Sequence, residues 1–324
     1  MNKLLLSAAL ALALTACNDA PPPAEPAAPA PAATPAPTPV EKTAAEQMGE
    51  RLDAALAGAQ RSDDNKARDQ YRHPKDTLLF FGLEPQMTVV EITPGGGWFT
   101  EVLAPALKDS GKLVAALADP ATVPSDRAKE YITKGNAGFR DKLAADTASY
   151  GQVEVVDFKL DAPSFGAPGS ADMVVTFRNV HNFTMWNADA AMFKAFFEVL
   201  KPNGVLGVTD HRAAPGTDAA TSAKTGYVSE EYVIKLATDA GFQLVETSEV
   251  NANPNDTKDH PNGVWTLPPT YALGDKDKDK YAAIGESDRM TLKFVKPAAP
   301  AEPTDPNKTA DSFEAAPAAS PAGG

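Results

Sequence analysis

The chain has 324 residues, a single cysteine and a net charge of −13. This length allows two domains, and the lone Cys17 excludes disulfides within the chain and thiolate metal sites. The negative charge argues against a nucleic-acid partner, because affinity for a phosphate backbone needs a basic surface. The acidity instead favours solubility.

The first 16 residues have the layout of an export signal. Lys3 supplies the positive end, residues 4–14 are apolar, and small residues precede Cys17. The apolar run is too short to span a bilayer permanently. Residues 14–17, Leu-Thr-Ala-Cys, resemble the lipobox of bacterial lipoproteins. The alternative is a chance cysteine after an apolar stretch.

The lipobox resemblance implies that Cys17 is lipidated and becomes the new N-terminus. We therefore expect a lipoprotein of the bacterial cell envelope, anchored in a membrane through Cys17 and facing the periplasm. The residues after Cys17 leave the inner and the outer membrane both open.

Two segments rich in Pro and Ala flank the middle of the chain. Residues 17–43 and 297–324 carry too little apolar surface to offset the entropy of ordering them, and Pro favours extended, solvated backbone. We expect a disordered tether and a disordered tail. One domain of ordinary size remains, residues 44–296, which is long enough to bury a sizeable core.

Short β-branched clusters alternate with amphipathic runs along this domain. Expected strands cover residues 88–92, 112–117, 153–158, 172–177 and 205–209. Expected helices cover residues 99–107, 125–143, 188–200 and 227–240. Two more strands are expected at residues 242–248 and 290–295. This order predicts an α/β fold with a mostly parallel sheet and helices on both faces.

Two segments lie outside the alternating pattern. Residues 44–81 form a helical lead-in before the first strand. Residues 249–289 separate the last two strands and are dense in Asn, Asp, His and Trp. Because loops of this length in compact domains are more often functional than idle, we expect a lid over a substrate. An inert hairpin insertion is the alternative.

A glycine-rich turn follows the first strand. Glu91 and Ile92 end the strand, and residues 93–98 read Thr-Pro-Gly-Gly-Gly-Trp before a helix begins. Such a turn lets backbone approach a ligand closely and directs helix N–H groups at it. A tight turn needed only for packing explains an isolated glycine cluster about as often. Acidic residues near the ends of other strands, Asp119 and Asp161, favour a ligand crevice.

These features resemble the class I S-adenosylmethionine-dependent methyltransferases over roughly residues 77–295. The most specific match is residues 193–208, Phe-Lys-Ala-Phe-Phe-Glu-Val-Leu-Lys-Pro-Asn-Gly-Val-Leu-Gly-Val, which are similar to a helix, turn and fifth strand of that family. The resemblance implies a Rossmann-like seven-stranded sheet with a reversed last strand. A narrower resemblance is to a group of predicted bacterial methyltransferases, through YRHP at 71–74, RNVHN at 178–182, DHR at 210–212 and IGESDR at 284–289.

The resemblance also implies a cofactor, S-adenosylmethionine, and positions that hold it. Glu91 and the turn of Pro94, Gly95, Gly96 and Gly97 would lie against its methionine part. Asp119 would bind the ribose hydroxyls and Asp161 would lie near the adenine amine, with Arg178 and Asn179 also at the cofactor. The chain departs from the family at Thr93, where a glycine is usual, and the spacing from Glu91 to Asp119 is long. A helix-capping role for Asp119 is the alternative.

Histidines follow two neighbouring strands and make the candidate catalytic group. His181 or His211 could take a proton from the acceptor as the methyl group arrives, with Arg178 beside them. A structural histidine bonded to a loop carbonyl is the alternative. The spacing matches no compact metal motif, so we expect no metal site. A metal-dependent enzyme that uses the histidine loops stays as the last alternative.

Candidate substrate contacts are polar or aromatic residues of the lead-in, the strand ends and the expected lid. They are Tyr71, His73, Asn182, Arg212, Asn253, His260, Trp265 and Arg289. The leading hypothesis is methyl transfer to a small-molecule acceptor. The second is an envelope protein that keeps the fold and binds another ligand without turnover, because an exported protein lies where the cofactor is not ordinarily supplied. The oligomeric state stays open.

Overall fold

The computed structural model describes residues 42–298. The export signal, the lipidation candidate Cys17 and nearly all of the tether and the tail lie outside the described residues. None of the helices in the described part has the length and apolar character needed to cross a bilayer.

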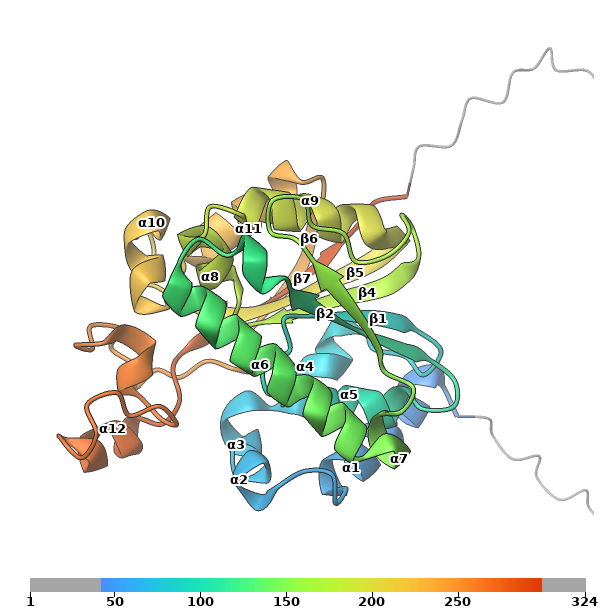
Figure 1. Ribbon diagram of the computed structural model, residues 1–324, viewed down its shortest axis with the longest axis horizontal. Helices are drawn as coiled ribbons and strands as arrows, with labels where there is room; N and C mark the ends of the chain where they lie inside the picture. Colours follow the sequence, from blue (N-terminus) through green and yellow to red (C-terminus); the bar gives the residue numbers. More distant parts are fainter. Residues whose placement is uncertain (1–41, 299–324) are drawn as a thin grey trace, which may run out of the picture. The chain divides into compact units, whose positions relative to one another are not determined.

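A seven-stranded sheet in the order β3-β2-β1-β4-β5-β7-β6 forms the centre of the domain (Figure 1). The strands are β1 (Thr88–Ile92), β2 (Lys112–Ala118), β3 (Glu154–Phe158), β4 (Ala171–Phe177), β5 (Leu200–His211), β6 (Gln243–Ser248) and β7 (Arg289–Val295). β7 runs antiparallel to both β5 and β6, and the other pairs are parallel. The prediction of a mostly parallel α/β sheet with a reversed last strand is confirmed.

Helices cover both faces of this sheet because alternate residues of the buried strands point to opposite sides. Val89 and Leu113 pack with α1 (Ala44–Ala57), α4 (Pro74–Phe81) and α5 (Thr100–Leu107). Val90 and Val114 pack on the other face with α8 (Val180–Met185), α9 (Asp189–Val199) and α11 (Glu230–Asp239). Figure 1 shows α9 and α11 on one side of the sheet and α1, α4 and α5 on the other.

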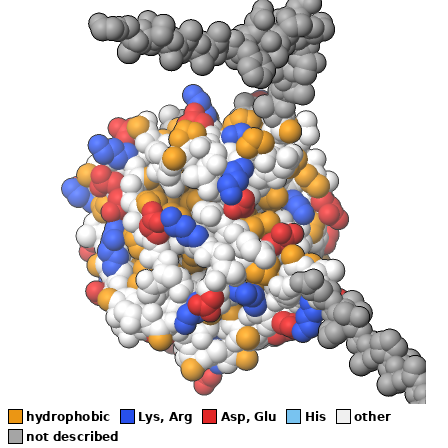
Figure 2. All heavy atoms as spheres, turned by 90° about the vertical axis from the view of Figure 1, so that its right-hand side faces the viewer, with side chains coloured by type: hydrophobic (Ala, Val, Ile, Leu, Met, Phe, Trp, Pro, Cys, Tyr) orange, Lys and Arg blue, Asp and Glu red, His pale blue; other side chains and the backbone are white. Residues whose placement is uncertain are grey.

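The remaining helices are short, with the exception of α6. They are α2 (Asp63–Lys66), α3 (Asp69–Arg72), α6 (Asp126–Ala145), α7 (Thr147–Tyr150), α10 (Ala219–Ser222), α12 (Lys278–Ile284) and the 3-10 turns η1 (Pro120–Thr122), η2 (Ala223–Thr225) and η3 (Gly263–Thr266). α6 packs Phe139 on Ala115 and Leu117 of β2. On the face drawn in Figure 2, Lys and Arg side chains are interspersed with Asp and Glu.

The structure refines several predicted boundaries. The lead-in is divided between α3 and α4, because His73 adopts a left-handed φ of 37°. Pro74 then begins α4, and the fixed φ of proline suits the first position of a helix. The helix expected at residues 227–240 begins at Glu230, since the side chain of Ser229 caps it and Val228 bridges to Arg212. Residues 180–185, which follow the fourth strand, form the helix α8, which was not predicted.

The connection between β6 and β7 packs against the rest of the domain. Tyr227, before α11, donates its hydroxyl to both carboxylate oxygens of Asp256 at 3.0 Å. Val264 and Trp265 of the connection pack with Tyr227 and Ala213. The connection is therefore fixed to the β5–α11 segment by buried contacts. Its closing over a substrate stays a prediction.

Candidate functional site

The carboxyl ends of β1, β4 and β5 meet at one edge of the sheet, beside the first residue of the reversed strand β7. His211 pairs with Arg289 across β5 and β7. Asn179, just after β4, donates to the carbonyl oxygens of Ile92 at 2.9 Å and Thr93 at 3.4 Å. The sequence predicted that the candidate residues lie at this edge. It is also the edge at which open α/β sheets bind ligands.

The glycine turn adopts backbone conformations that suit glycine. Thr93, Gly95 and Gly97 have φ of 49°, 60° and 78°. A Cβ added at Gly95 or Gly96 would meet no atom within 4 Å, whereas one at Gly97 would lie 3.1 Å from the Phe139 ring. Gly95 and Gly96 are exposed and Gly97 is buried. Gly97 therefore serves packing, while Gly95 and Gly96 leave open backbone that a ligand can approach.

Glu91, at the end of β1 before the turn, is a buried carboxyl group with a raised pKa. Its side chain is 2% exposed and accepts a hydrogen bond from the Thr100 hydroxyl at 2.6 Å. Burial raises the pKa of Glu91 to about 7, and the Thr100 hydrogen bond and the charge of Lys142 oppose that rise only partly. Glu91 can therefore carry or lose a proton near neutral pH.

The two acids expected at the adenosine part have different surroundings. The Asp119 carboxylate accepts from the backbone N–H of Ala121 at 2.9 Å and caps η1. Asp119 thus has the capping contact that was its alternative role, while its other oxygen has no partner among the described residues. Asp161 is exposed in the turn after β3.

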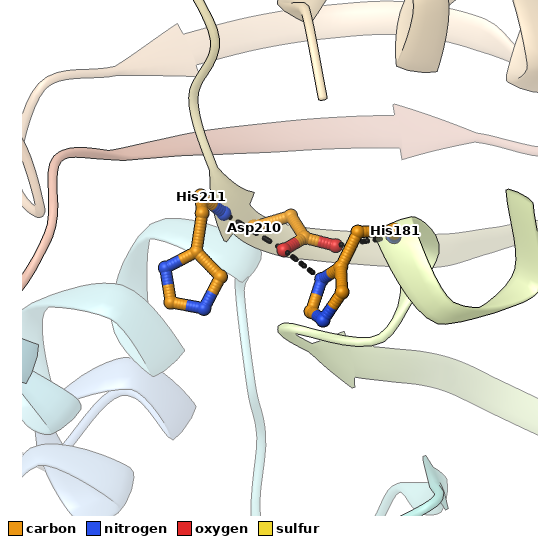
Figure 3. Close-up of side chains that lie close together, drawn as sticks. All are labelled: His181, Asp210 and His211. Carbon is orange, nitrogen blue, oxygen red and sulfur yellow. Dashed lines mark hydrogen bonds and ion pairs between the residues drawn. The ribbon is translucent and has the colours of Figure 1, made fainter. Parts of the chain in front are cut away.

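His181 and His211 are held by Asp210, which is fully buried (Figure 3). His181 Nδ1 lies 3.0 Å from Asp210 Oδ1, and the backbone N–H of His181 donates to Oδ2 at 3.2 Å. The backbone N–H of His211 donates to Oδ1 at 2.7 Å. Because a carboxylate only accepts, His181 Nδ1 carries the proton and its Nε2 is the basic atom. Figure 3 shows both rings on the same side of β5.

His211 is kept neutral by its surroundings. Burial lowers the pKa of His211 well below its usual value, and His181, Arg289, Arg178 and Arg72 lower it further. Its Nδ1 is hydrogen-bonded to the Ser287 hydroxyl. Ring centroids of His181 and His211 are 5.5 Å apart. The side chains of His181, Asp210 and His211 also bring three potential metal-ligand atoms within 4.8 Å of one another. The sequence predicted that the two histidines are neighbours, but it predicted no metal site.

Arginines form a second group beside these histidines. Arg68 Nε and Arg72 Nε donate to the two oxygens of Glu286 at 2.6 and 3.0 Å, and Arg289 Nη2 also contacts Glu286. Arg178 has a left-handed φ of 63°, and burial, followed by the charge of Arg289, lowers its pKa to about 10. The Arg72 guanidinium lies 4.7 Å from the centroid of the Trp98 ring, which directly follows the glycine turn.

Several expected substrate contacts make bonds within the protein. Arg212 donates to Glu249 at 2.8 and 2.6 Å and to Asp288 at 3.1 and 3.0 Å. His260 Nε2 lies 2.8 Å from Asp256 Oδ1. The Asn253 amide donates to backbone carbonyls at residues 284 and 286. These residues hold the β6–β7 connection in place.

Other expected contacts lie nearer to the histidines or to a cavity. The Trp265 ring centroid is 6.2 Å from that of His181, and Asn182 lies partly buried in α8. A cavity of about 290 Å³ separates the lead-in from the β6–β7 connection, and its lining includes Tyr71, His73, Asn253, Gly285, Glu286 and Ser287. Glu286 and Ser287 link this cavity to the arginines and to His211.

Sequence reasoning assigned no role to Arg68, Arg72, Asp210, Glu286 or Ser287. All but Arg68 lie within the motifs at residues 71–74, 210–212 and 284–289, so those motifs were the available signal.

The chain is similar to known proteins in structure but not in sequence. No protein-family model and no curated protein matches the sequence. A [4+2]-cyclase, SpnF, is 15% identical, with 81% of this chain and 98% of that chain covered and a TM-score of 0.50. A SAM-dependent methyltransferase from Aquifex aeolicus is 16% identical, with 79% and 100% covered and a TM-score of 0.47.

A SAM-dependent methyltransferase from Methanosarcina mazei is 12% identical, with 68% and 98% covered and a TM-score of 0.42. With the strand order and the reversed β7 described above, the chain has the Rossmann-like class I methyltransferase fold.

Proposed function

We propose that the protein transfers a methyl group from S-adenosylmethionine to a small-molecule acceptor. The observation that carries the proposal is the placement of an open glycine turn and a His–Asp pair at one edge of the sheet. Gly95 and Gly96 leave unfilled backbone where a cofactor can lie, and His181 is oriented by Asp210 on the neighbouring strand ends.

The residues of the chain have separate tasks in this reaction. When bound, the cofactor supplies an electrophilic methyl group on a sulfonium. The turn at residues 93–98 and Glu91 behind it hold the methionine part, and Asn179 keeps the end of β4 against that turn. His181 Nε2 accepts the proton of the attacking O–H, N–H or S–H group, and Asp210 stabilises the imidazolium that results.

Binding of the cofactor is the first test. The purified full chain is titrated with S-adenosylmethionine and S-adenosylhomocysteine by calorimetry. The informative variant is Gly95→Ala, because its Cβ meets no protein atom but would meet a ligand at the turn. Gly169→Ala is the matched control, since Gly169 has a similar φ of 67°, equally open space and a position before β4, at the opposite sheet edge.

We expect at least a tenfold loss of affinity in Gly95→Ala and none in Gly169→Ala, with similar losses of stability in both. No binding of either ligand at millimolar concentration would exclude the proposal. Equal affinities in both variants would exclude a cofactor at this turn.

We also propose that Cys17 anchors the chain in the cell envelope. That location supports the second candidate, a ligand-binding envelope protein without turnover, because the cofactor is not ordinarily supplied there. The two are separated by incubating the chain with S-adenosylmethionine and acceptors and measuring S-adenosylhomocysteine. Metabolic labelling with a fatty acid, with Cys17→Ser as control, tests the anchor.

The grouping of His181, Asp210 and His211 supports a metal-dependent enzyme as a third candidate. Arg72, Arg178 and Arg289 weigh against it, since cations that already lower the pKa of His211 also repel a metal ion. Elemental analysis of the chain after incubation with Zn²⁺ distinguishes it. A stoichiometric ion that is lost in His211→Gln would favour this candidate.

A further inference from the structure

Four arginines gather around a single carboxylate between the glycine turn and the histidines. We call Arg68, Arg72, Arg178 and Arg289 the arginine cluster. Three of them contact Glu286, which is 2% exposed. Burial alone would raise the pKa of Glu286, but Arg289, Arg72 and Arg68 lower it to about 2, so it is ionised. The cluster therefore has more positive charge than Glu286 can neutralise.

Donor atoms of the cluster lack partners although they are buried. Arg72 is 3% exposed, and its Nη1 and Nη2 have no hydrogen-bond acceptor among residues 42–298. Arg289 Nε is in the same condition. Arg178 is partly exposed, and its guanidinium donates no hydrogen bond to any residue of the described chain. Buried guanidinium groups without acceptors are unfavourable, because the desolvation of their charge is not offset.

The position of the cluster relates it to the reacting groups. Arg178 directly follows β4 and Arg289 faces His211 across β5 and β7. Arg72 stacks on Trp98 at the end of the glycine turn. The cavity is lined by Glu286, which contacts Arg72, and by Ser287, which contacts His211. An anion held by Arg72 and Arg289 would lie near Trp98 and His211.

The cofactor as a whole is a poor match for this charge. Its sulfonium and ammonium groups are both positive and outnumber its one carboxylate, so the surplus of guanidinium groups opposes its binding unless another anion is present. A carboxylate or phosphate on the acceptor supplies that anion. The planar guanidinium binds either group through two parallel hydrogen bonds.

We propose that Arg72, Arg178 and Arg289 bind an anionic group, a carboxylate or a phosphate, of the methyl acceptor. This inference rests on the proposed methyl transfer and names the class of its substrate. The bound anion supplies acceptors to the unpartnered guanidinium nitrogens. It also offsets the repulsion between the cluster and the sulfonium, so acceptor and cofactor bind with positive cooperativity.

The test titrates the full chain with inorganic phosphate and with succinate, each with and without S-adenosylmethionine, at constant ionic strength set with NaCl. Binding is measured by calorimetry and by thermal shift. Arg178→Met is the main variant, because the loss of its guanidinium removes no hydrogen bond or ion pair among the described residues. Arg72→Met is the second variant. Arg140→Met, which removes an exposed pair with Asp157, is the control for loss of one positive charge.

We expect at least one of the two anions to bind to the native chain, and its affinity to fall at least tenfold in Arg178→Met and in Arg72→Met. Arg140→Met should bind as the native chain does, and S-adenosylmethionine, which carries the sulfonium, should raise the anion affinity. No binding of either anion to the native chain, or equal binding in all variants, would overturn the proposal.

A further experiment tests whether the arginine cluster binds the anionic group of the acceptor or the carboxylate of the cofactor. S-adenosylhomocysteine and 5′-methylthioadenosine, which lacks the amino-acid part, are titrated into each variant. If the arginine variants weaken S-adenosylhomocysteine tenfold but leave 5′-methylthioadenosine unchanged, the cluster holds the cofactor carboxylate and the proposal is overturned. Unchanged affinity for both supports the acceptor.

Failure of the methyl-transfer proposal is visible separately. It appears as absence of S-adenosylhomocysteine binding in the native chain, whatever the anions do. If the chain bound an anion but not S-adenosylhomocysteine, the anion could not be assigned to a methyl acceptor.

Discussion

Asp210 orients His181 through two hydrogen bonds, one to the ring Nδ1 at 3.0 Å and one to the backbone N–H at 3.2 Å. Asp210→Asn keeps the shape of the side chain but replaces one acceptor oxygen with a donor, so His181 loses its orientation. We expect the rate of methyl transfer to fall by about 10²- to 10⁴-fold, measured as formation of S-adenosylhomocysteine with an accepted substrate.

The affinity for S-adenosylhomocysteine should stay within about twofold in Asp210→Asn, because Asp210 acts on the base and not on the cofactor. Asp189→Asn, which alters another buried carboxylate that accepts from Tyr232 at 2.5 Å, is the control and should turn over normally. If Asp210→Asn transferred the methyl group as fast as the native chain does, His181 would not be the base.

Glu91 gives the stability of the domain a defined pH dependence. Its pKa rises from 4.5 to about 7 on folding. The contribution of Glu91 to the free energy of unfolding is therefore fully present below pH 4.5 and is lost as the pH rises through 7. At about 1.4 kcal/mol per pH unit, the carboxylate is less favourable than the acid by about 3 kcal/mol above pH 7. Glu91→Gln keeps an acceptor for Thr100 and does not ionise.

We therefore expect Glu91→Gln to be clearly more stable than the native chain at pH 8, and the difference to become small at pH 4.5. Urea unfolding at the two pH values measures it. Glu50→Gln, in an exposed pair with Lys42, is the control. The same stability difference at both pH values would contradict the raised pKa.

Asp256 fixes the β6–β7 connection through four donors. It accepts from the Tyr227 hydroxyl and His260 Nε2 and from the backbone N–H groups of Lys258 and Asp288. Asp256→Ala leaves these buried donors unpaired, at about 1–3 kcal/mol for each group that stays buried. Tyr227→Phe removes one hydrogen bond without leaving a buried donor behind.

We expect Asp256→Ala to lower the free energy of unfolding by several times the loss in Tyr227→Phe. Hydrogen exchange should accelerate in the connection before it does in the central strands. If Asp256→Ala cost no more than Tyr227→Phe, the connection would not depend on these buried contacts.

Strand positions were predictable from the sequence because local signals define them. Thr88–Ile92 was predicted to the residue, since a β-branched run ends at a turn of Pro and Gly. The helix α8 was missed because residues 180–185 contain Asn, Thr and His, which are poor helix formers. Its formation depends on burial of Val180 and Phe183, which only the folded sheet provides.

The arginine cluster illustrates what the sequence could not provide. Arg72 and Glu286 are 214 positions apart, and Arg68 and Glu286 are 218 apart. Each lies near a recognisable motif, but their meeting depends on the reversal of β7, which returns residues 286–289 to the edge where β5 ends. His181 and His211 were predicted to be neighbours because their strands were expected to be adjacent.

Thr93 carries backbone strain that a glycine at this position would avoid. Its φ of 49° is left-handed, which is unfavourable by roughly 1–2 kcal/mol for a residue with a Cβ. Its buried hydroxyl has no hydrogen-bond partner among residues 42–298. Thr93→Gly removes both penalties, and the greater flexibility of glycine in the unfolded chain offsets part of the gain.

We expect Thr93→Gly to raise the free energy of unfolding by about 1 kcal/mol and to keep the affinity for S-adenosylhomocysteine within about threefold. Asn203→Gly is the matched control, because Asn203 has a φ of 65° and asparagine tolerates that region better than threonine. Its gain should be smaller. A loss of stability in Thr93→Gly would mean that the threonine side chain makes contacts that outweigh the strain of its backbone.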